Sequence, residues 1–373
     1  MENDVIRRNK KEKSGIFAGF LLIIIAIFLL FFNEARAVDT EKVISVAKDS
    51  YIEVSSSKVD ESNNGKLVVT SGKLDLINDN VTDDEFNVNV KSAKLVRLVE
   101  MYQWYEDCED DSSGKEVCTY SKKWSNTIID DSGFESGYVN PDVMAFSSSE
   151  FYMSNVNLGE YVLNIDLLSQ LSTSELYSEL DEKIAKNKGV NIVDGMYTTY
   201  ESNESPEVGD IRIKFLYNNA SDISVMAVQN KNSFIEFSPE GTSYKIFELR
   251  ESVMNGNEFI EDLAKSNSTL TWIFRFFGTV LMIAGVASIL KFISFLASFI
   301  PFFGKIIVKG IFIVSVLVGI SLSLIIIAIS WFVVRPLLSI ILIAIVIGLI
   351  VLLRKYNKKK NITELVENTV VEN

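Results

Sequence analysis

The chain has 373 residues, carries a formal net charge of −13 and contains no histidine. The missing histidine excludes Ser-His-Asp and Cys-His nucleophile systems, histidine-ligated zinc and imidazole-based pH sensing. The acidic balance also argues against nucleic acid as a partner.

Four long apolar runs dominate the hydropathy pattern, one near the start of the chain and three near its end. A transmembrane helix needs roughly 20 mostly apolar residues to cross the hydrocarbon core of a bilayer. We therefore predict an integral membrane α+β protein with four transmembrane helices, one N-terminal and three C-terminal, and a large β-rich extracytoplasmic domain between the first and the second. The predicted helices span residues 15–33, 271–290, 306–332 and 337–353.

Lysine and arginine residues flank these runs on alternating sides. Basic residues near a span favour its cytoplasmic side. They gather in the N-terminal segment 1–14, in 291–305 and in the tail 354–373, whereas Arg335 alone lies between the last two runs. We predict that both termini are cytoplasmic and that the domain 34–270 is extracytoplasmic, which for an internal membrane means lumenal. The phenylalanine-rich segment 291–305 is predicted to lie along the cytoplasmic interface.

A cleaved signal peptide is the competing interpretation of the first run. Ala35-Arg36-Ala37 has the small-x-small pattern of a cleavage site, although the apolar run is longer than a usual signal sequence. The polar domain is extracytoplasmic under both interpretations.

The charges are divided unevenly between this domain and the rest of the chain. Residues 34–270 include 43 acidic and 21 basic residues, a net charge of −22, while the remainder has 6 and 15, a net charge of +9. Solubility explains an acidic domain, and a basic or cation-rich partner is the alternative. The composition implies no cofactor.

The two cysteines, Cys108 and Cys118, bracket turn material between two strand-like stretches. This spacing suits a disulfide across a β-hairpin in an oxidising compartment. Two free thiols are the alternative, and two cysteines alone lack the further soft ligands of a metal site.

Three other patterns are weaker indications of a functional site. The carboxylates of 106–111 would suit a loose Ca²⁺ site, but such a dense run is usually a solvated loop. Ser55 and Lys58 have the spacing of a Ser/Lys dyad in surroundings typical of a turn. Four Asn-x-Ser/Thr triplets of the predicted extracytoplasmic domain would accept glycans in a glycosylating compartment, at Asn80, Asn203, Asn219 and Asn267.

Short β-prone runs recur along the polar domain, several with the alternation of half-buried strands. We predict strands at 66–70, 86–90, 94–105, 161–165, 211–217, 223–229 and 244–249. The best helical signal is 172–186, where Leu176 and Leu180 lie four residues apart and Thr173 or Ser174 would cap the helix. A second helix is expected around 253–264.

Small residues recur at helical spacing within the apolar runs. In a membrane such residues let helices approach closely. We predict helix-packing positions at Gly15, Gly19, Gly278, Gly285, Ser315, Gly319 and Ser323. The last three form a stripe that would serve an interface within the chain or between protomers.

Several blocks resemble those of one known family, in the same order along the chain. They comprise Asn33, Glu34 and Arg36 after the first run; Glu100, Met101, Tyr102, Gln103 and Trp104; Asn140 and Pro141; Pro206, Glu207, Val208, Gly209, Asp210 and Arg212; and Trp331, Arg335 and Pro336. With these blocks and its layout of one span followed by three, the chain resembles the LUMA family (transmembrane protein 43). Ala35 departs from the glycine usual in that family.

The resemblance implies a non-enzymatic protein that organises membrane-protein complexes and forms oligomers. It places eukaryotic members in the endoplasmic reticulum and the inner nuclear membrane, and bacterial members would lie in the plasma membrane. From the residues themselves, we interpret the blocks at 100–104 and 206–210 and the turn at Arg335-Pro336 as maintaining the fold, with ligand contact as the alternative. Asn33, Glu34 and Arg36 are expected to dock this domain onto the spans.

Our leading hypothesis is a multi-pass scaffold whose partners are the lipid bilayer, other membrane proteins and copies of itself. The alternative is an extracytoplasmic sensor or ligand-binding module coupled to the transmembrane bundle, which predicts an apolar pocket within 36–265. A third hypothesis, an enzyme that uses carboxylates alone, predicts two acidic residues converging in a cleft.

Overall fold

The structure is a computed structural model that describes residues 2–77, 80–110, 116–298, 304–336 and 340. It divides into two compact units, which are described separately. The helical unit comprises Met1–Val46, Ser238–Tyr244 and Ile260–Asn373, and the β-rich unit comprises Ala47–Phe237 and Lys245–Phe259.

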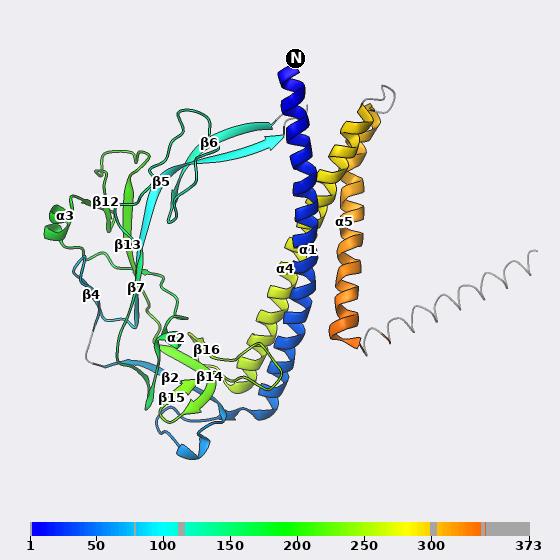
Figure 1. Ribbon diagram of the computed structural model, residues 1–373. Coiled ribbons are helices and arrows are strands. Elements are labelled where there is room, and N and C mark those ends of the chain that lie inside the picture. Colours follow the sequence, from blue (N-terminus) through cyan, green and yellow to red (C-terminus); the bar gives the residue numbers. More distant parts are fainter. Residues whose placement is uncertain (1, 78–79, 111–115, 299–303, 337–339, 341–373) are drawn as a thin grey trace, which may run out of the picture. The chain divides into compact units, whose positions relative to one another are not determined.

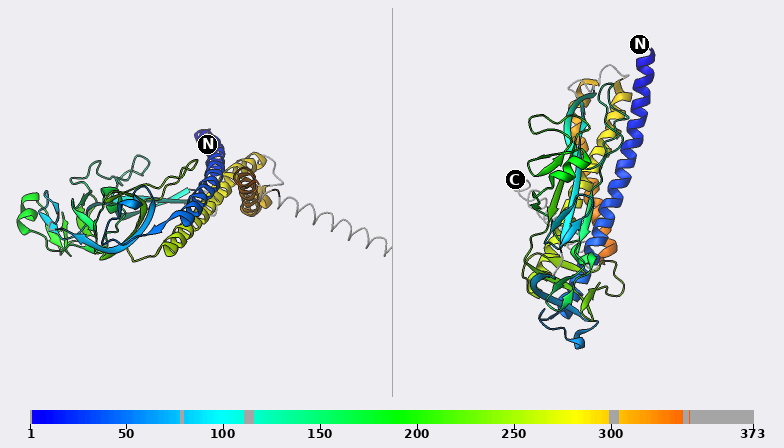
Figure 2. Two further views of the ribbon diagram at one scale, coloured as in Figure 1. Left: turned by 90° about the horizontal axis from the view of Figure 1, so that it is seen from below. Right: turned by 90° about the vertical axis from the view of Figure 1, so that its left-hand side faces the viewer.

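In the described residues, three long helices could span a membrane: α1 (Glu2–Ser50), α4 (Gly256–Ser298) and α5 (Gly304–Val334). Each is long and apolar enough to cross a membrane, with candidate spans at Ile16–Ser50, Gly256–Lys291 and Ile311–Val334. The three helices run side by side in the views of Figures 1 and 2. The first three predicted spans therefore fall on helices.

The structure describes only part of the other predicted membrane segments. The fourth predicted span, 337–353, lies outside the described residues except for Ile340. Helix α4 continues without a break past residue 290 to Ser298, so the predicted interfacial segment 291–305 starts inside this helix. Residues 299–303 and the tail 354–373 are outside the described part.

Helices α1 and α4 are much longer than the bilayer requires. They contain 49 and 43 residues, which corresponds to about 70 and 65 Å of helix, against about 30 Å of hydrocarbon. The boundary predicted at residue 33 is therefore not a break in the backbone, because α1 continues through the polar residues that follow. This continuation aligns polar side chains of α1 with those of α4.

The β-rich unit contains two seven-stranded sheets. The first has the order β15-β14-β2-β8-β9, with β1 beside β2 and β16 beside β14. Its strands are β1 (Ile52–Glu53), β2 (Leu67–Leu76), β8 (Val156–Leu158), β9 (Tyr161–Val162), β14 (Asp222–Asn230), β15 (Ser233–Ile235) and β16 (Glu248–Arg250). Its neighbouring strands are antiparallel except β1 and β2.

The second sheet has the order β11-β12-β13-β5-β6, with β10 beside β13 and β7 beside β5. Its strands are β5 (Lys94–Asp110), β6 (Glu116–Ser125), β7 (Ser149–Tyr152), β10 (Glu175–Leu176), β11 (Asn191–Val193), β12 (Met196–Thr198) and β13 (Ile211–Tyr217). The smaller elements are β3 (Val81–Asp83), its partner β4 (Val88–Val90), the 3-10 helix η1 (Glu61–Asn63), α2 (Ile165–Leu168) and α3 (Glu182–Lys188).

Alternating side chains give each sheet its own apolar cluster. In β13, Ile211, Ile213 and Phe215 are 4%, 0% and 0% exposed, while the intervening Arg212 and Lys214 lie on the other face. The three apolar residues Ile211, Ile213 and Phe215 pack with residues of β5, including Val99, in one cluster. A separate cluster under the first sheet is built around aromatic and branched residues that include Tyr161, Phe234, Leu158 and Val225.

The helix predicted at 172–186 is wrong. Residues 175–176 form β10, in which Leu176 pairs with Leu216 of β13, and a helix follows only at 182–188. Neither Thr173 nor Ser174 caps it: the Asp181 side chain accepts a hydrogen bond from the N–H of Lys183, and Gly189 ends the helix at φ +69°.

Other predicted elements keep their location, and some of them differ in length. The strand at 211–217 has its predicted bounds, and that at 223–229 extends by one residue at each end. The strand at 161–165 is shortened because Asn164 caps α2. The helix predicted at 253–264 is the beginning of α4.

Candidate functional site

One buried carboxylate connects all three long helices. Glu34 of α1 is 2% exposed. It accepts hydrogen bonds from Nε and Nη2 of Arg275 in α4, at 2.6 and 2.9 Å, and from the indole Nε1 of Trp331 in α5, at 2.7 Å. Because charged groups beside an apolar span need close partners, this contact fixes the three helices relative to one another.

A second set of polar contacts joins α1 to α4 alone. The Arg36 guanidinium donates to Asn33 Oδ1 at 3.3 Å, Thr271 Oγ1 at 2.9 Å and Asn267 Oδ1 at 3.0 Å. Asn33 donates to the carbonyl of Thr271 at 3.1 Å, and Asn267 donates to the carbonyl of Ala37 at 3.0 Å. Together with the Glu34 contacts, we call this set the polar brace.

Helical spacing explains how the brace assembles. On α4, Asn267, Thr271 and Arg275 are four residues apart, so they lie along one face of the helix. On α1, Asn33 and Arg36 are three residues apart and meet this face together. Two short polar patterns are thus sufficient to define the register of α1 against α4.

A pocket of about 320 Å³ lies beside the brace and within the helical unit. Glu34, Ala37, Glu41 and Ile44 contribute its α1 wall. The remaining walls come from α4 and the end of α5: Ala264, Asn267, Ser268, Thr271, Trp272, Arg275, Trp331 and Arg335.

Ion pairs and aromatic rings shape this pocket. Arg335 pairs with Glu41, and its backbone N–H bonds the carbonyl of Trp331 at 2.8 Å. The Arg275 guanidinium lies 4.8 Å from the ring centroid of Trp272 and 5.9 Å from that of Trp331. The pocket therefore combines paired charges with two indole rings.

Small residues pack the same three helices closely. A Cβ added at Gly19 would lie 2.9 Å from the Gly285 carbonyl oxygen. One added at Gly278 would lie 2.6 Å from Leu30, and one at Gly319 would lie 2.6 Å from Ile283.

Gly319, the central residue of the predicted stripe in α5, thus contacts α4 of the same chain. Ser315 and Ser323 are 0% and 1% exposed, on the same helix as Gly319. The side chains around the predicted position Gly15 lie outside the described ones.

A second group of family-motif residues meets in the β-rich unit. Asn140 is 6% exposed, and its side chain accepts from the Trp104 N–H at 2.7 Å and donates to the carbonyl oxygens of Trp104 and Ile129 at 3.1 and 3.4 Å. The neighbouring Gln103 is fully buried and bonds the carbonyl of Thr127 and the N–H of Ile129. Both amides tie β5 to the segment after β6.

The 206–212 block connects β13 to the same part of β5. Asp210 accepts hydrogen bonds from the N–H of Glu207 and the hydroxyl of Thr199. The Tyr102 backbone bonds the Asp210 carbonyl and the Gly209 N–H. Gly209 has φ +99°, which disfavours other residues, and an added Cβ would lie 3.3 Å from Pro141.

Glu100 links these strands through charge. It accepts from Nε of Arg212 at 2.7 Å and pairs with Nζ of Lys214 at 2.8 Å. Burial acts to raise the pKa of the Glu100 carboxyl, but the hydrogen bonds from Arg212 and Lys214 outweigh it and lower that pKa. Arg212 also lies 4.4 Å from the ring centroid of Trp124.

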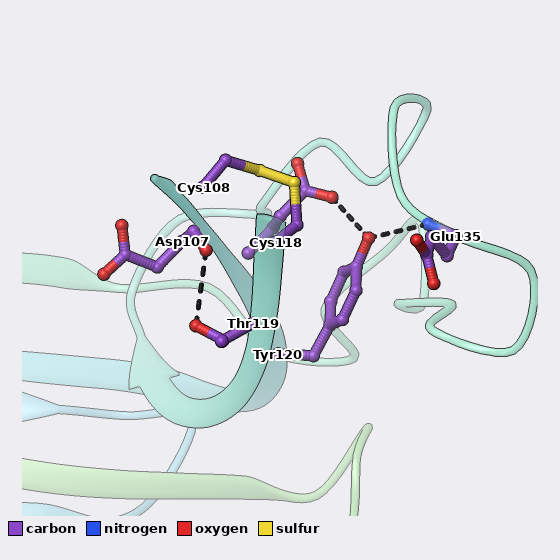
Figure 3. The surroundings of a disulfide bond; sticks show 7 residues. Asp107, Cys108, Cys118, Thr119, Tyr120 and Glu135 are labelled. Carbon is purple, nitrogen blue, oxygen red and sulfur yellow. Dashed lines mark hydrogen bonds between the residues drawn. A yellow bond between two sulfur atoms is a disulfide. The ribbon is translucent and has the colours of Figure 1, made fainter. Parts of the chain in front are cut away.

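The predicted hairpin is present, and Cys108 and Cys118 are joined by a disulfide (Figure 3). Glu106 accepts a hydrogen bond from the Tyr120 hydroxyl, which itself accepts one from the N–H of Glu135. The sulfur atoms lie within 4.8 Å of a Glu106 oxygen but are bonded to each other, so they are not thiolate ligands. The hairpin tip is covalently closed.

Two of the weaker sequence candidates have ordinary surroundings. The Ser55 hydroxyl lies 2.9 Å from that of Ser57 in an exposed turn. The Asn267 side chain bonds Arg36 and Ala37, as part of the polar brace.

The expectation that Asn33, Glu34 and Arg36 dock the polar domain is replaced by a different finding. Their partners are Asn267, Thr271, Arg275 and Trp331, on the other helices of the helical unit. From the sequence, Asn267 was predicted only as a glycan acceptor, and Arg275 lies inside the second predicted span. Their spacing with Thr271 was the available signal.

These features define a membrane protein with at least three apolar helices and a large β-rich domain. The family model described as Transmembrane protein 43 matches residues 101–336, which is more than half of the chain. The chain belongs to the Transmembrane protein 43 family.

Curated relatives are similar over nearly their whole length. The chain is 27% identical to Transmembrane protein 43 of Homo sapiens, over 90% of this chain and 88% of the relative. It is 27% identical to the Rattus norvegicus protein, over 89% and 87%, and to the Drosophila melanogaster homolog, over 86% and 89%. No solved structure matches the chain.

Proposed function

We propose that the chain is a non-enzymatic, multi-pass membrane scaffold that organises membrane-protein complexes and associates with itself. The observation that carries this proposal is the engagement of Glu34. Both of its oxygens are bonded, to Arg275 and to Trp331, so this acid positions helices. A catalytic or proton-carrying acid would instead keep an oxygen free for a substrate or a proton.

The surfaces of α5 support the same role. Gly319 contacts Ile283 of α4, and Ser315 and Ser323 are buried, whereas large apolar side chains are exposed, including Phe312 at 72%, Leu317 at 63% and Leu324 at 61%. Lipid tails cover such a surface by default, and helices of other membrane proteins can replace them. Because the small-residue stripe is used within the chain, we assign association to the large apolar side chains.

The proposed orientation follows from the basic clusters. Both termini are cytoplasmic and the β-rich unit is extracytoplasmic, in the endoplasmic reticulum and nuclear envelope of a eukaryote or the plasma membrane of a bacterium. Glycan addition at the exposed Asn203, in cells that glycosylate, tests this orientation. An unglycosylated Asn203 together with a glycosylated tag at residue 1 would contradict it.

Site-directed photo-cross-linking in native membranes tests the association surface. A photoreactive residue at Phe312 or Leu324 should yield cross-links to other membrane proteins or to a second copy. The same residue at Ser323, 1% exposed on the same helix, is the control and should cross-link within the chain. Equal intermolecular yields at all three positions would contradict the proposed surface.

A further inference from the structure

The pocket beside the polar brace has the features of a lipid site. We propose that it binds the headgroup of a glycerophospholipid, and that it prefers a zwitterionic headgroup containing a phosphate and an amine. The proposal is independent of the scaffold function, because a monomeric protein would bind such a lipid equally well.

The shape of the site indicates an amphiphilic ligand. The polar pocket shares Ser268 and Trp272 with a shallow apolar pocket on α4, which continues along Ile273, Phe276 and Phe277. Phe276 and Phe277 are 65% and 55% exposed. A molecule that occupies both pockets must be polar at one end and apolar at the other, as membrane lipids are.

The charges of the pocket favour a zwitterion. Its wall contains two carboxylates, Glu34 and Glu41, and two guanidinium groups, Arg275 and Arg335, arranged as two ion pairs. The formal charge of these four groups is zero. A headgroup with a net charge would therefore leave one charge uncompensated, whereas a phosphate and an amine together would not.

The two ion pairs differ in accessibility. In the Glu34–Arg275 pair, the side chains are 3% and 18% exposed, so it forms the closed side of the pocket. In the Glu41–Arg335 pair they are 61% and 32% exposed. The accessible pair can open to take the amine at Glu41 and the phosphate at Arg335.

The aromatic residues of the pocket also suit a site at the level of the lipid headgroups. Trp272 is 64% exposed and forms part of both pockets. Tryptophan favours the level of lipid headgroups, where its ring contacts apolar chains and its N–H meets polar groups. The electron-rich face of an indole also attracts amine cations.

Native mass spectrometry of the full chain in mild detergent, titrated with single lipids, tests the proposal. We expect dioleoyl-phosphatidylethanolamine to bind more tightly than dioleoyl-phosphatidylglycerol. Trp272→Ala and Arg335→Gln should each weaken phosphatidylethanolamine binding by roughly tenfold. Phe17→Ala, which removes an aromatic side chain exposed elsewhere on the helices, is the control and should leave this binding unchanged.

The exchange variant Glu41→Arg/Arg335→Glu separates a lipid site from a purely structural pair. It preserves the ion pair, so the melting temperature should be retained while phosphatidylethanolamine binding stays weakened. Full recovery of lipid binding would contradict the assigned positions of phosphate and amine.

Three other outcomes would overturn the proposal. They are equal binding by wild type and Trp272→Ala, preference for phosphatidylglycerol, and competition by free phosphoethanolamine at the same concentration as the lipid. The last would identify a site for a small polar molecule.

Discussion

The carboxylate of Glu34 and the guanidinium of Arg275 form a two-pronged ion pair across 241 positions of the sequence, at 2.6 and 2.9 Å. Such a pair fixes both the register and the rotation of two helices, because each nitrogen must meet its own oxygen. The indole of Trp331 extends this constraint to α5. The contacts of Glu34 therefore fix α1, α4 and α5 relative to one another.

Replacing Glu34 with Gln should destabilise the helical unit strongly. The Arg275 charge would lose its partner, and breaking a buried pair costs roughly 3–5 kcal/mol. The measurement is the unfolding transition of the full chain in mild detergent. Glu41→Gln, in a more exposed pair, is the control and should cost about 0–1 kcal/mol. Equal transitions for the two variants would contradict the importance assigned to the brace.

Replacing Gly319 with Leu should separate α5 from α4. Even the Cβ would lie 2.6 Å from Cγ1 and 2.8 Å from Cα of Ile283, and overpacking of this kind costs roughly 1–3 kcal/mol. The matched variant Ser321→Leu adds the same side chain at an exposed position and should be nearly neutral. Disulfide cross-linking between cysteines placed in α4 and α5 measures the separation, and unchanged yields in both variants would refute this packing.

The Asn140→Asp variant tests the contact between β5 and the segment after β6. A carboxylate still accepts from the Trp104 N–H but donates no hydrogen bond to the carbonyls of Trp104 and Ile129. Leaving such groups unsatisfied should cost roughly 1–3 kcal/mol. Denaturant unfolding followed by tryptophan fluorescence measures the loss. The exposed Asn219→Asp is the control, and a similar small effect in both would show that Asn140 is dispensable.

Acid should remove part of the stability that Glu100 provides. Its pKa is lowered in the folded protein from the usual 4.5, because hydrogen bonds from Arg212 and Lys214 outweigh the effect of burial. The folded state therefore holds this proton less tightly than the unfolded chain. Its contribution is present above pH 4.5 and disappears as the pH falls through the lower, folded pKa.

Glu100→Gln should accordingly be less stable than wild type at neutral pH, and the difference should shrink below pH 4.5. The measurement is the free energy of unfolding of both proteins between pH 7 and pH 3. Glu240→Gln, at an exposed position, is the control. A difference that stays constant with pH would show that the Glu100 charge does not contribute.

The sequence predicts much of the architecture because its strongest signals are local. Apolar runs identify the described spans, and alternation such as Ile211, Ile213 and Phe215 identifies strands whose faces differ in burial. The 172–186 segment fails for a physical reason. Leu176 and Leu180 have helical spacing, but Leu176 pairs with Leu216 in a strand. The helix begins only after Asp181, which caps it.

The brace depends on contacts that are distant in sequence. Asn33, Glu34 and Arg36 are visible as a polar block after a span, but nothing local indicates whether their partners lie in the helices or in the polar domain. Helix α1 continues past residue 33, and the block therefore contacts α4. The pocket could not be predicted, because it arises where α5 ends beside two helices that continue.

The mass of the solubilised protein tests the proposed self-association and complex formation. Native mass spectrometry of the chain extracted from its own membrane in mild detergent should give species heavier than one chain of 41.9 kDa. We expect multiples of this mass, or this mass plus that of other membrane proteins, in a fixed ratio. A single species at 41.9 kDa, apart from bound lipid, would contradict the scaffold function.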